Sequence, residues 1–145
     1  MRAFVVEAFG GFSPERDPHA ALKFALTRAF SDGMVGELLR LLDFADRVGA
    51  IGGEPGWEIE RRSPRPLDPS VYDSWPPHAR FRAYVDPEGF AMAYPEVYCD
   101  AHTFASHVWV AAAVYGRRHP EDMPLVARML DLLPKRPAPE AAEVG

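Results

Sequence analysis

The spacing of apolar positions divides the chain into segments of different periodicity. The opening run, residues 2–9, is apolar, rich in β-branched and aromatic side chains, and followed by two glycines, which predicts a strand. Apolar residues then recur at helical spacing up to Phe30, behind Asp17, a helix-capping residue followed by proline. A second apolar face over residues 35–48 predicts another helix, with Gly49 placed as its C-cap.

The middle of the chain changes character. Residues 49–56 contain four glycines and a proline, which predicts a loop. Residues 57–61 alternate apolar and polar positions, as a half-buried strand does. Five prolines within residues 64–77 exclude regular structure there. Residues 80–85 alternate again, and the Asp-Pro-Glu-Gly sequence at 86–89 predicts a tight turn. A returning strand should then carry Phe90, Met92 and Tyr94.

The last third of the chain has helical periodicity. Asp100 is placed to cap a helix that ends near Gly116. A final helix follows, with acidic residues in its first turn and Pro134 behind its last apolar position. Residues 135–145 are rich in Pro, Ala and Glu and predict a disordered tail, so residues 1–134 form the expected single domain.

These elements predict an α+β fold. The expected order is β-α-α-β-β-β-α-α, with a small antiparallel sheet of about four strands packed against about four helices. A chain of 145 residues buries enough surface to fold as one domain without a metal or disulfide.

Composition narrows the functional classes. Cys99 is the one cysteine, which excludes an intrachain disulfide and fits a reducing cytoplasm. A net charge of −5 argues against nucleic acid as a partner, because phosphate binding needs clustered cations. No apolar stretch approaches the roughly 20 residues of a membrane span. We therefore expect a cytoplasmic protein that does not enter a membrane.

Cys99, His102 and His107 are the candidate chemical cluster. Cys99 and His102 are three residues apart and share a face if the helix begins early, whereas His107 lies about 140° further round than His102. With no second cysteine, we expect no metal site and no cofactor. A cysteine nucleophile with His102 as its base remains an alternative, which would make this a small cytoplasmic enzyme with a small-molecule substrate. The neighbouring Asp100 opposes thiolate formation at Cys99.

Two other groups of residues favour protein binding. Glu58 and Glu60 point to the same side of their strand and form an acidic stripe, although the arginines that follow are typical of a solvated edge. Tyr72 and Trp75 lie in the proline-stiffened segment, where large aromatic side chains offer contact area at low ordering cost. The alternative for these two rings is that they fold back onto the core.

The chain resembles bacterial immunity proteins, the cognate inhibitors of polymorphic or type VI secreted toxins. The resemblance lies in size, in the mixed order of elements and in residues 80–133, including the sequence from Tyr98 through Phe104 to Tyr115 and Leu133. It rests on overall arrangement, so no family site residue is carried over. It implies a cytoplasmic inhibitor that binds one toxin tightly, often by blocking its active site with acidic and aromatic residues.

An independent electrostatic argument agrees with this resemblance. Many antibacterial toxins act on nucleic acids or nucleotides and present cationic clefts, toward which an acidic protein is steered. We therefore expect a protein partner, such as a secreted toxin, and a homodimer is the other association left open. The predicted contact residues are acidic and aromatic: Glu58, Glu60, Asp68, Tyr72, Asp73 and Trp75.

Overall fold

The computed structural model describes residues 2–53 and 56–134. It confirms the α+β class and shows a four-stranded antiparallel sheet with strands in the order β1-β2-β3-β4. The element order is α-α-α-β-β-β-β-α-α, which differs from the prediction. The strands are β1 (Ala50–Gly53), β2 (Trp57–Arg61), β3 (Phe81–Val85) and β4 (Glu96–Cys99). The helices are α1 (Arg2–Phe9), α2 (Ala20–Ser31), α3 (Val35–Leu42), α4 (Ala101–Arg118) and α5 (Met123–Leu132), with short 3-10 helices η1 (Pro69–Tyr72) and η2 (Pro120–Asp122).

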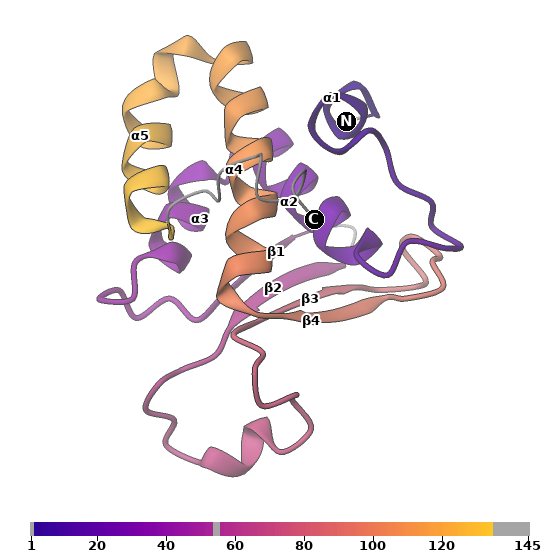
Figure 1. Cartoon of the computed structure of the whole chain (residues 1–145), viewed down its shortest axis with the longest axis vertical. Helices are drawn as coiled ribbons and strands as arrows, with labels where there is room; N and C mark the ends of the chain where they lie inside the picture. Colours follow the sequence, from indigo (N-terminus) through magenta and orange to yellow (C-terminus); the bar gives the residue numbers. More distant parts are fainter. Residues whose placement is uncertain (1, 54–55, 135–145) are drawn as a thin grey trace, which may run out of the picture.

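The helices cover one face of the sheet and leave the other uncovered (Figure 1). Alternate strand residues, such as Ile59 and Ala83, are buried on the helix side. There Phe81 of β3 stacks on Phe104 of α4, with ring centroids 3.8 Å apart and planes 4° from parallel. The connection between β2 and β3 projects away from the helices and carries η1 at its far end (Figure 1).

Residues 2–9 form a helix, so the predicted opening strand is wrong. Phe4 and Val5 are buried, and Phe4 stacks on Phe30 of α2. Glu7 faces α4, where it forms ion pairs with two arginines near the end of that helix. Packing against α2 and α4 overrides the β-propensity of this segment. The two glycines that follow take φ values of +69° and +86°, as residues that end a helix commonly do.

The glycine-rich segment that was predicted to be a loop contains strand β1. Ile51 lies opposite Ile59 in the antiparallel ladder and is buried with it. A Cβ at Gly52 would stand 2.6 Å from the carbonyl oxygen of Trp57, and one at Gly53 would stand 2.9 Å from the Trp57 indole nitrogen. Here the glycines allow close approach of a neighbouring strand instead of marking a loop.

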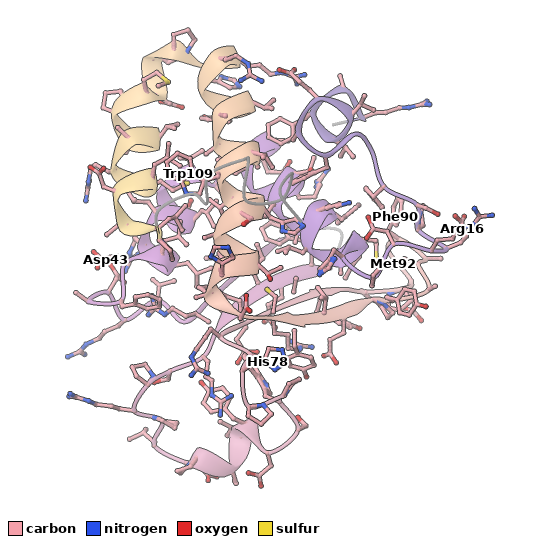
Figure 2. The ribbon with its side chains drawn as sticks, in the orientation of Figure 1. Arg16, Asp43, His78, Phe90, Met92 and Trp109 are labelled. Carbon is pink, nitrogen blue, oxygen red and sulfur yellow. The ribbon has the colours of Figure 1, made fainter. Side chains whose placement is uncertain are left out.

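The returning strand was predicted too early in the chain. The turn forms, with the amide of Gly89 2.9 Å from the carbonyl oxygen of Asp86, but the strand is Glu96–Cys99. Phe90 instead packs against Phe24 of α2, with ring centroids 4.9 Å apart, and its segment lies outside the ladder. Figure 2 shows Phe90 and Met92 beside the N-terminal connection that carries Arg16.

Helix α3 ends at Leu42, earlier than the predicted end at residue 48. Beyond it, the carboxylates of Asp43 and Asp46 accept hydrogen bonds from amides two residues further on, a local geometry that competes with the helix. The buried Arg61 donates to one carbonyl in the last turn of α3 and to two beyond it, those of Asp43 at 3.0 Å and Asp46 at 2.9 Å. The end of β2 therefore fixes the chain between α3 and β1.

Several local predictions are confirmed. Asp100 caps α4 by accepting a hydrogen bond from the Thr103 amide at 2.7 Å. The final helix lies where the apolar face predicted it, although the acidic residues expected in its first turn lie in η2. The predicted cap of α2 is wrong: the helix begins at Ala20 with His19 as its N-cap, and Asp17 accepts a hydrogen bond from the His19 amide at 2.8 Å before the helix starts. The proline-rich segment is irregular except for η1. None of the helices in the described ranges is sufficiently long and apolar to span a bilayer. The predicted tail, residues 135–145, lies outside the described residues.

Candidate protein-binding surface

The uncovered sheet face carries a cluster of charged and aromatic side chains. Its floor comes from the outward-pointing positions of three strands, which alternate with the buried ones. Pairing places Glu58 opposite Tyr84, and Tyr84 opposite Glu96. We call these outward positions the acidic face: Glu58, Glu60, Arg82, Tyr84, Glu96 and Tyr98.

Arg82 is the centre of the acidic face. Its guanidinium lies 2.9 Å from a carboxylate oxygen of Glu58 and 3.5 Å from one of Glu60. On the other side its Nε lies 2.5 Å from Glu96. Tyr84 packs beneath the same guanidinium, whose central carbon is 5.1 Å from the ring centroid. Three carboxylates face one cation, so the cluster keeps a net charge of −2.

The surroundings of Glu60 disfavour its charged form. Partial burial raises its pKa above the ordinary value, and the nearby charge of Glu58 adds to the rise, while Arg82 opposes it. The cluster therefore holds more negative charge than its own arginine neutralises. An incoming cation would relieve that repulsion.

Three aromatic side chains form a row at one end of the acidic face, which we call the aromatic row: Tyr98, Trp75 and Tyr72. Trp75 packs edge-on against Tyr98 of the sheet, with centroids 5.1 Å apart, and edge-on against Tyr72 at 5.0 Å. Tyr72 in turn accepts a hydrogen bond from the Ser63 amide at 2.7 Å. Trp75 is buried, so it holds the projecting connection against the uncovered side of the sheet and does not cover the helix-side core.

The structure separates the predicted contact residues into two groups. Glu58 and Glu60 lie on the acidic face, and Trp75 reaches its edge through Tyr98. Asp68 and Asp73 lie exposed in the projecting connection, at the two ends of η1. There Asp68 caps η1 by accepting hydrogen bonds from the amide and hydroxyl of Ser70, which lower the pKa of its carboxyl group.

Sequence reasoning missed four members of the acidic face. Arg82 and Tyr84 are the polar positions of the alternating segment 80–85, so the pattern that located the strand also placed them on its outer side. Glu96 and Tyr98 were missed because the last strand was predicted at residues 90–94, so neither residue was assigned to a strand.

Cys99 does not have the surroundings of a nucleophile. Its side chain is buried on the helix side of β4, and burial raises the pKa of its thiol to about 12, with a further contribution from Asp100. His102 is exposed in the first turn of α4. Across residues 2–53 and 56–134, no group of three or more His, Cys, Asp or Glu side chains is arranged to hold a metal ion.

Comparison with protein-family models gave no match, and the searches of curated proteins and of solved structures gave none either. The functional argument therefore rests on the geometry of the acidic face and of its aromatic border.

Proposed function

We propose that this protein is a cytoplasmic protein-binding inhibitor of the immunity-protein kind, which neutralises a cognate bacterial toxin by direct binding through the acidic face. The observation that supports this most is the Arg82 cluster: three carboxylates gathered around one guanidinium on a sheet face that no helix covers.

The cluster is suited to recognise a cationic surface. Glu58, with its side chain 46% exposed, and Glu96, with 39%, both keep oxygen atoms available to solvent. Arg82 restricts their movement, so these two side chains would lose less entropy when a partner binds them than free surface carboxylates would. The net negative charge speeds encounter with a basic partner.

Tyrosines border these charges. Tyr84 and Tyr98 are half-buried on the outward side of the sheet, and rings of this kind supply much of the binding energy at protein interfaces. A row of charged residues with aromatic neighbours thus provides both steering and contact area. The toxin that fits this surface presents a basic patch, as an enzyme that acts on nucleic acid or nucleotides does.

The test is affinity capture from bacterial lysate and culture medium with two baits compared side by side. One bait is the wild-type chain and the other is Glu58→Gln/Glu96→Gln, which keeps hydrogen-bond acceptors for Arg82 but removes two charges. We expect a stoichiometric protein on the wild-type bait that is at least about tenfold depleted on the variant, the effect of losing about 1.4 kcal/mol. High salt should weaken its capture.

A matched control removes the same charge elsewhere. Glu15→Gln/Glu37→Gln alters two exposed carboxylates outside the acidic face and should capture the partner as the wild type does. Equal capture by all three baits, or no stoichiometric protein on any of them, would contradict the proposal.

A further inference from the structure

A second surface of opposite charge lies on the other side of the aromatic row. A hollow of about 530 Å³ opens between Phe44, in the chain after α3, and the projecting connection, with Tyr72 in its wall. A larger hollow of about 990 Å³ adjoins it, and the two share Phe44, Ser63 and Pro64. Together they form one extended groove, which we call the arginine groove.

The groove concentrates positive charge on an acidic protein. Its lining contains five arginines and one carboxylate, that of Asp46, which already forms an ion pair with Arg40. The whole chain, in contrast, has a net charge of −5. Four of these arginines make no ion pair with any residue in the described ranges: Arg47, Arg62, Arg65 and Arg80.

Two of the guanidinium groups are held in place by contacts with the projecting connection. Arg62 lies over the Tyr72 ring, 4.9 Å from its centroid, and directs Nη1 to backbone carbonyls of the same connection. Arg80 directs Nη1 to two carbonyls there, each at 3.1 Å. The Nε and Nη2 donors of both side chains have no acceptor within the described part of the chain. A guanidinium fixed in this way can offer its remaining donors to a carboxylate at low entropic cost.

Apolar side chains stand along the same groove. Phe44 is 61% exposed, and Leu67 is fully exposed. Prolines form much of the remaining wall and keep it rigid. Exposed apolar side chains gathered beside unpaired arginines are typical of a surface that another protein covers.

We propose that the arginine groove binds an extended acidic segment of a protein partner, with carboxylates on Arg62 and Arg80 and an apolar side chain against Phe44. The charge complementarity selects an acidic occupant, and two adjoining hollows suit a chain segment better than a compact small molecule. This inference does not rest on the proposed function. The groove would bind an acidic segment, whereas the acidic face would bind a basic surface.

The aromatic rings favour a peptide over a single-stranded nucleic acid. Bases bind such proteins by stacking on open aromatic faces. Arg62 covers Tyr72, which also packs against Trp75, and Arg61 lies over Phe44 at 5.1 Å from its centroid. Tyr72 is therefore already packed against Arg62 and Trp75, and Phe44 keeps exposed surface for one apolar side chain but forms no row of open rings with Tyr72.

A random dodecapeptide library displayed on phage tests this proposal with the full chain as target. We expect the enriched peptides to carry at least two acidic residues and one apolar residue. Synthetic copies, labelled with fluorescein, should bind the wild type at least tenfold more tightly than Arg62→Gln/Arg80→Gln. Because these two side chains also hold the projecting connection, Arg47→Gln/Arg65→Gln serves as a second variant and should weaken binding at least threefold.

The matched control is Arg16→Gln/Arg128→Gln, which removes two exposed arginines outside the groove. Figure 2 shows Arg16 at the opposite end of the molecule from Asp43, the neighbour of Phe44. This control should bind the peptides as the wild type does, and so should Glu58→Gln/Glu96→Gln on the acidic face. The proposal is overturned if the library enriches no acidic peptides, if both arginine variants keep full affinity, or if labelled dT12 binds more tightly than every enriched peptide.

Discussion

The two faces of the sheet bury their side chains in different ways. On the helix side, the side chains of Ile59, Ala83 and Phe104 are almost completely buried in the hydrophobic core. On the other side, Arg82 and its three glutamates remain partly exposed and are paired with one another. The first face is filled by α2 and α4, and the second is bordered at one end by Trp75 and Tyr98.

This difference separates the residues that stabilise the fold from those that we propose for recognition. Burial of apolar surface is the main source of folding free energy, whereas ion pairs near the surface contribute about 0–1 kcal/mol each. The ion pairs of the acidic face therefore contribute little to the free energy of folding. Substitutions on the two sides should show this division directly.

The largest expected effect concerns the thiol on the helix side. Since the pKa of Cys99 is about 12, its thiolate fraction at pH 8 is about a thousandfold below that of an ordinary thiol. Native protein should react with iodoacetamide at least about a thousandfold more slowly than protein unfolded in guanidinium chloride, as mass spectrometry would show. Rapid modification of the native chain would contradict the burial of Cys99 and revive the cysteine-nucleophile alternative.

The next effect compares one aromatic residue from each side of the sheet, the first in α4 and the second in β3. Phe104→Ala removes the ring stacked on Phe81 and should lower the free energy of unfolding by about 3–5 kcal/mol. Tyr84→Ala on the acidic face should lower it by about 1 kcal/mol or less, because that ring is half-exposed. Urea denaturation followed by circular dichroism measures both. Equal losses would show that the two faces do not differ as proposed.

The smallest effect is a pH-dependent one at the junction of the sheet with α4. Hydrogen bonds from Thr103 lower the pKa of the Asp100 carboxyl group. The stabilisation by its charge is therefore complete above the unfolded pKa of about 3.9 and is lost as pH falls through the lower folded value. At pH 7, Asp100→Ala should cost about 1 kcal/mol.

Asp100→Asn is the matched control, because asparagine caps a helix without a charge. The stability difference between wild type and Asp100→Asn should shrink as the pH is lowered from 6 to 2 in denaturation measurements. A difference that grows toward low pH would contradict the assigned cap.

The sequence predicted those elements whose signals are local. Asp100 and the apolar face behind it identify α4, and the alternation of residues 80–85 identifies β3. The errors arose where distant contacts decide the structure. Phe4 in α1 packs on Phe30, and Phe90 packs on Phe24, so the conformation of each segment depends on partners that periodicity does not reveal.

The candidate site was predicted only in part, because some of its residues are brought together by contacts between segments distant in the sequence. Glu58 and Glu60 could be placed together from strand alternation alone. Their connection to Glu96 through Arg82 depends on the register of β4, which was misplaced. The arginine groove joins the chain after α3 to the connection between β2 and β3, so only the folded arrangement brings its residues together.

The central claim is that the acidic face inhibits a toxin, and growth rescue tests it most directly. The protein captured on the wild-type bait is expressed in a bacterial host alone, with the wild-type chain, with Glu58→Gln/Glu96→Gln, or with Glu15→Gln/Glu37→Gln. We predict that it stops growth when expressed alone, that the wild type and the control variant restore growth, and that the acidic-face variant does not. A captured protein that is harmless alone, or equal rescue by all three chains, would contradict the account.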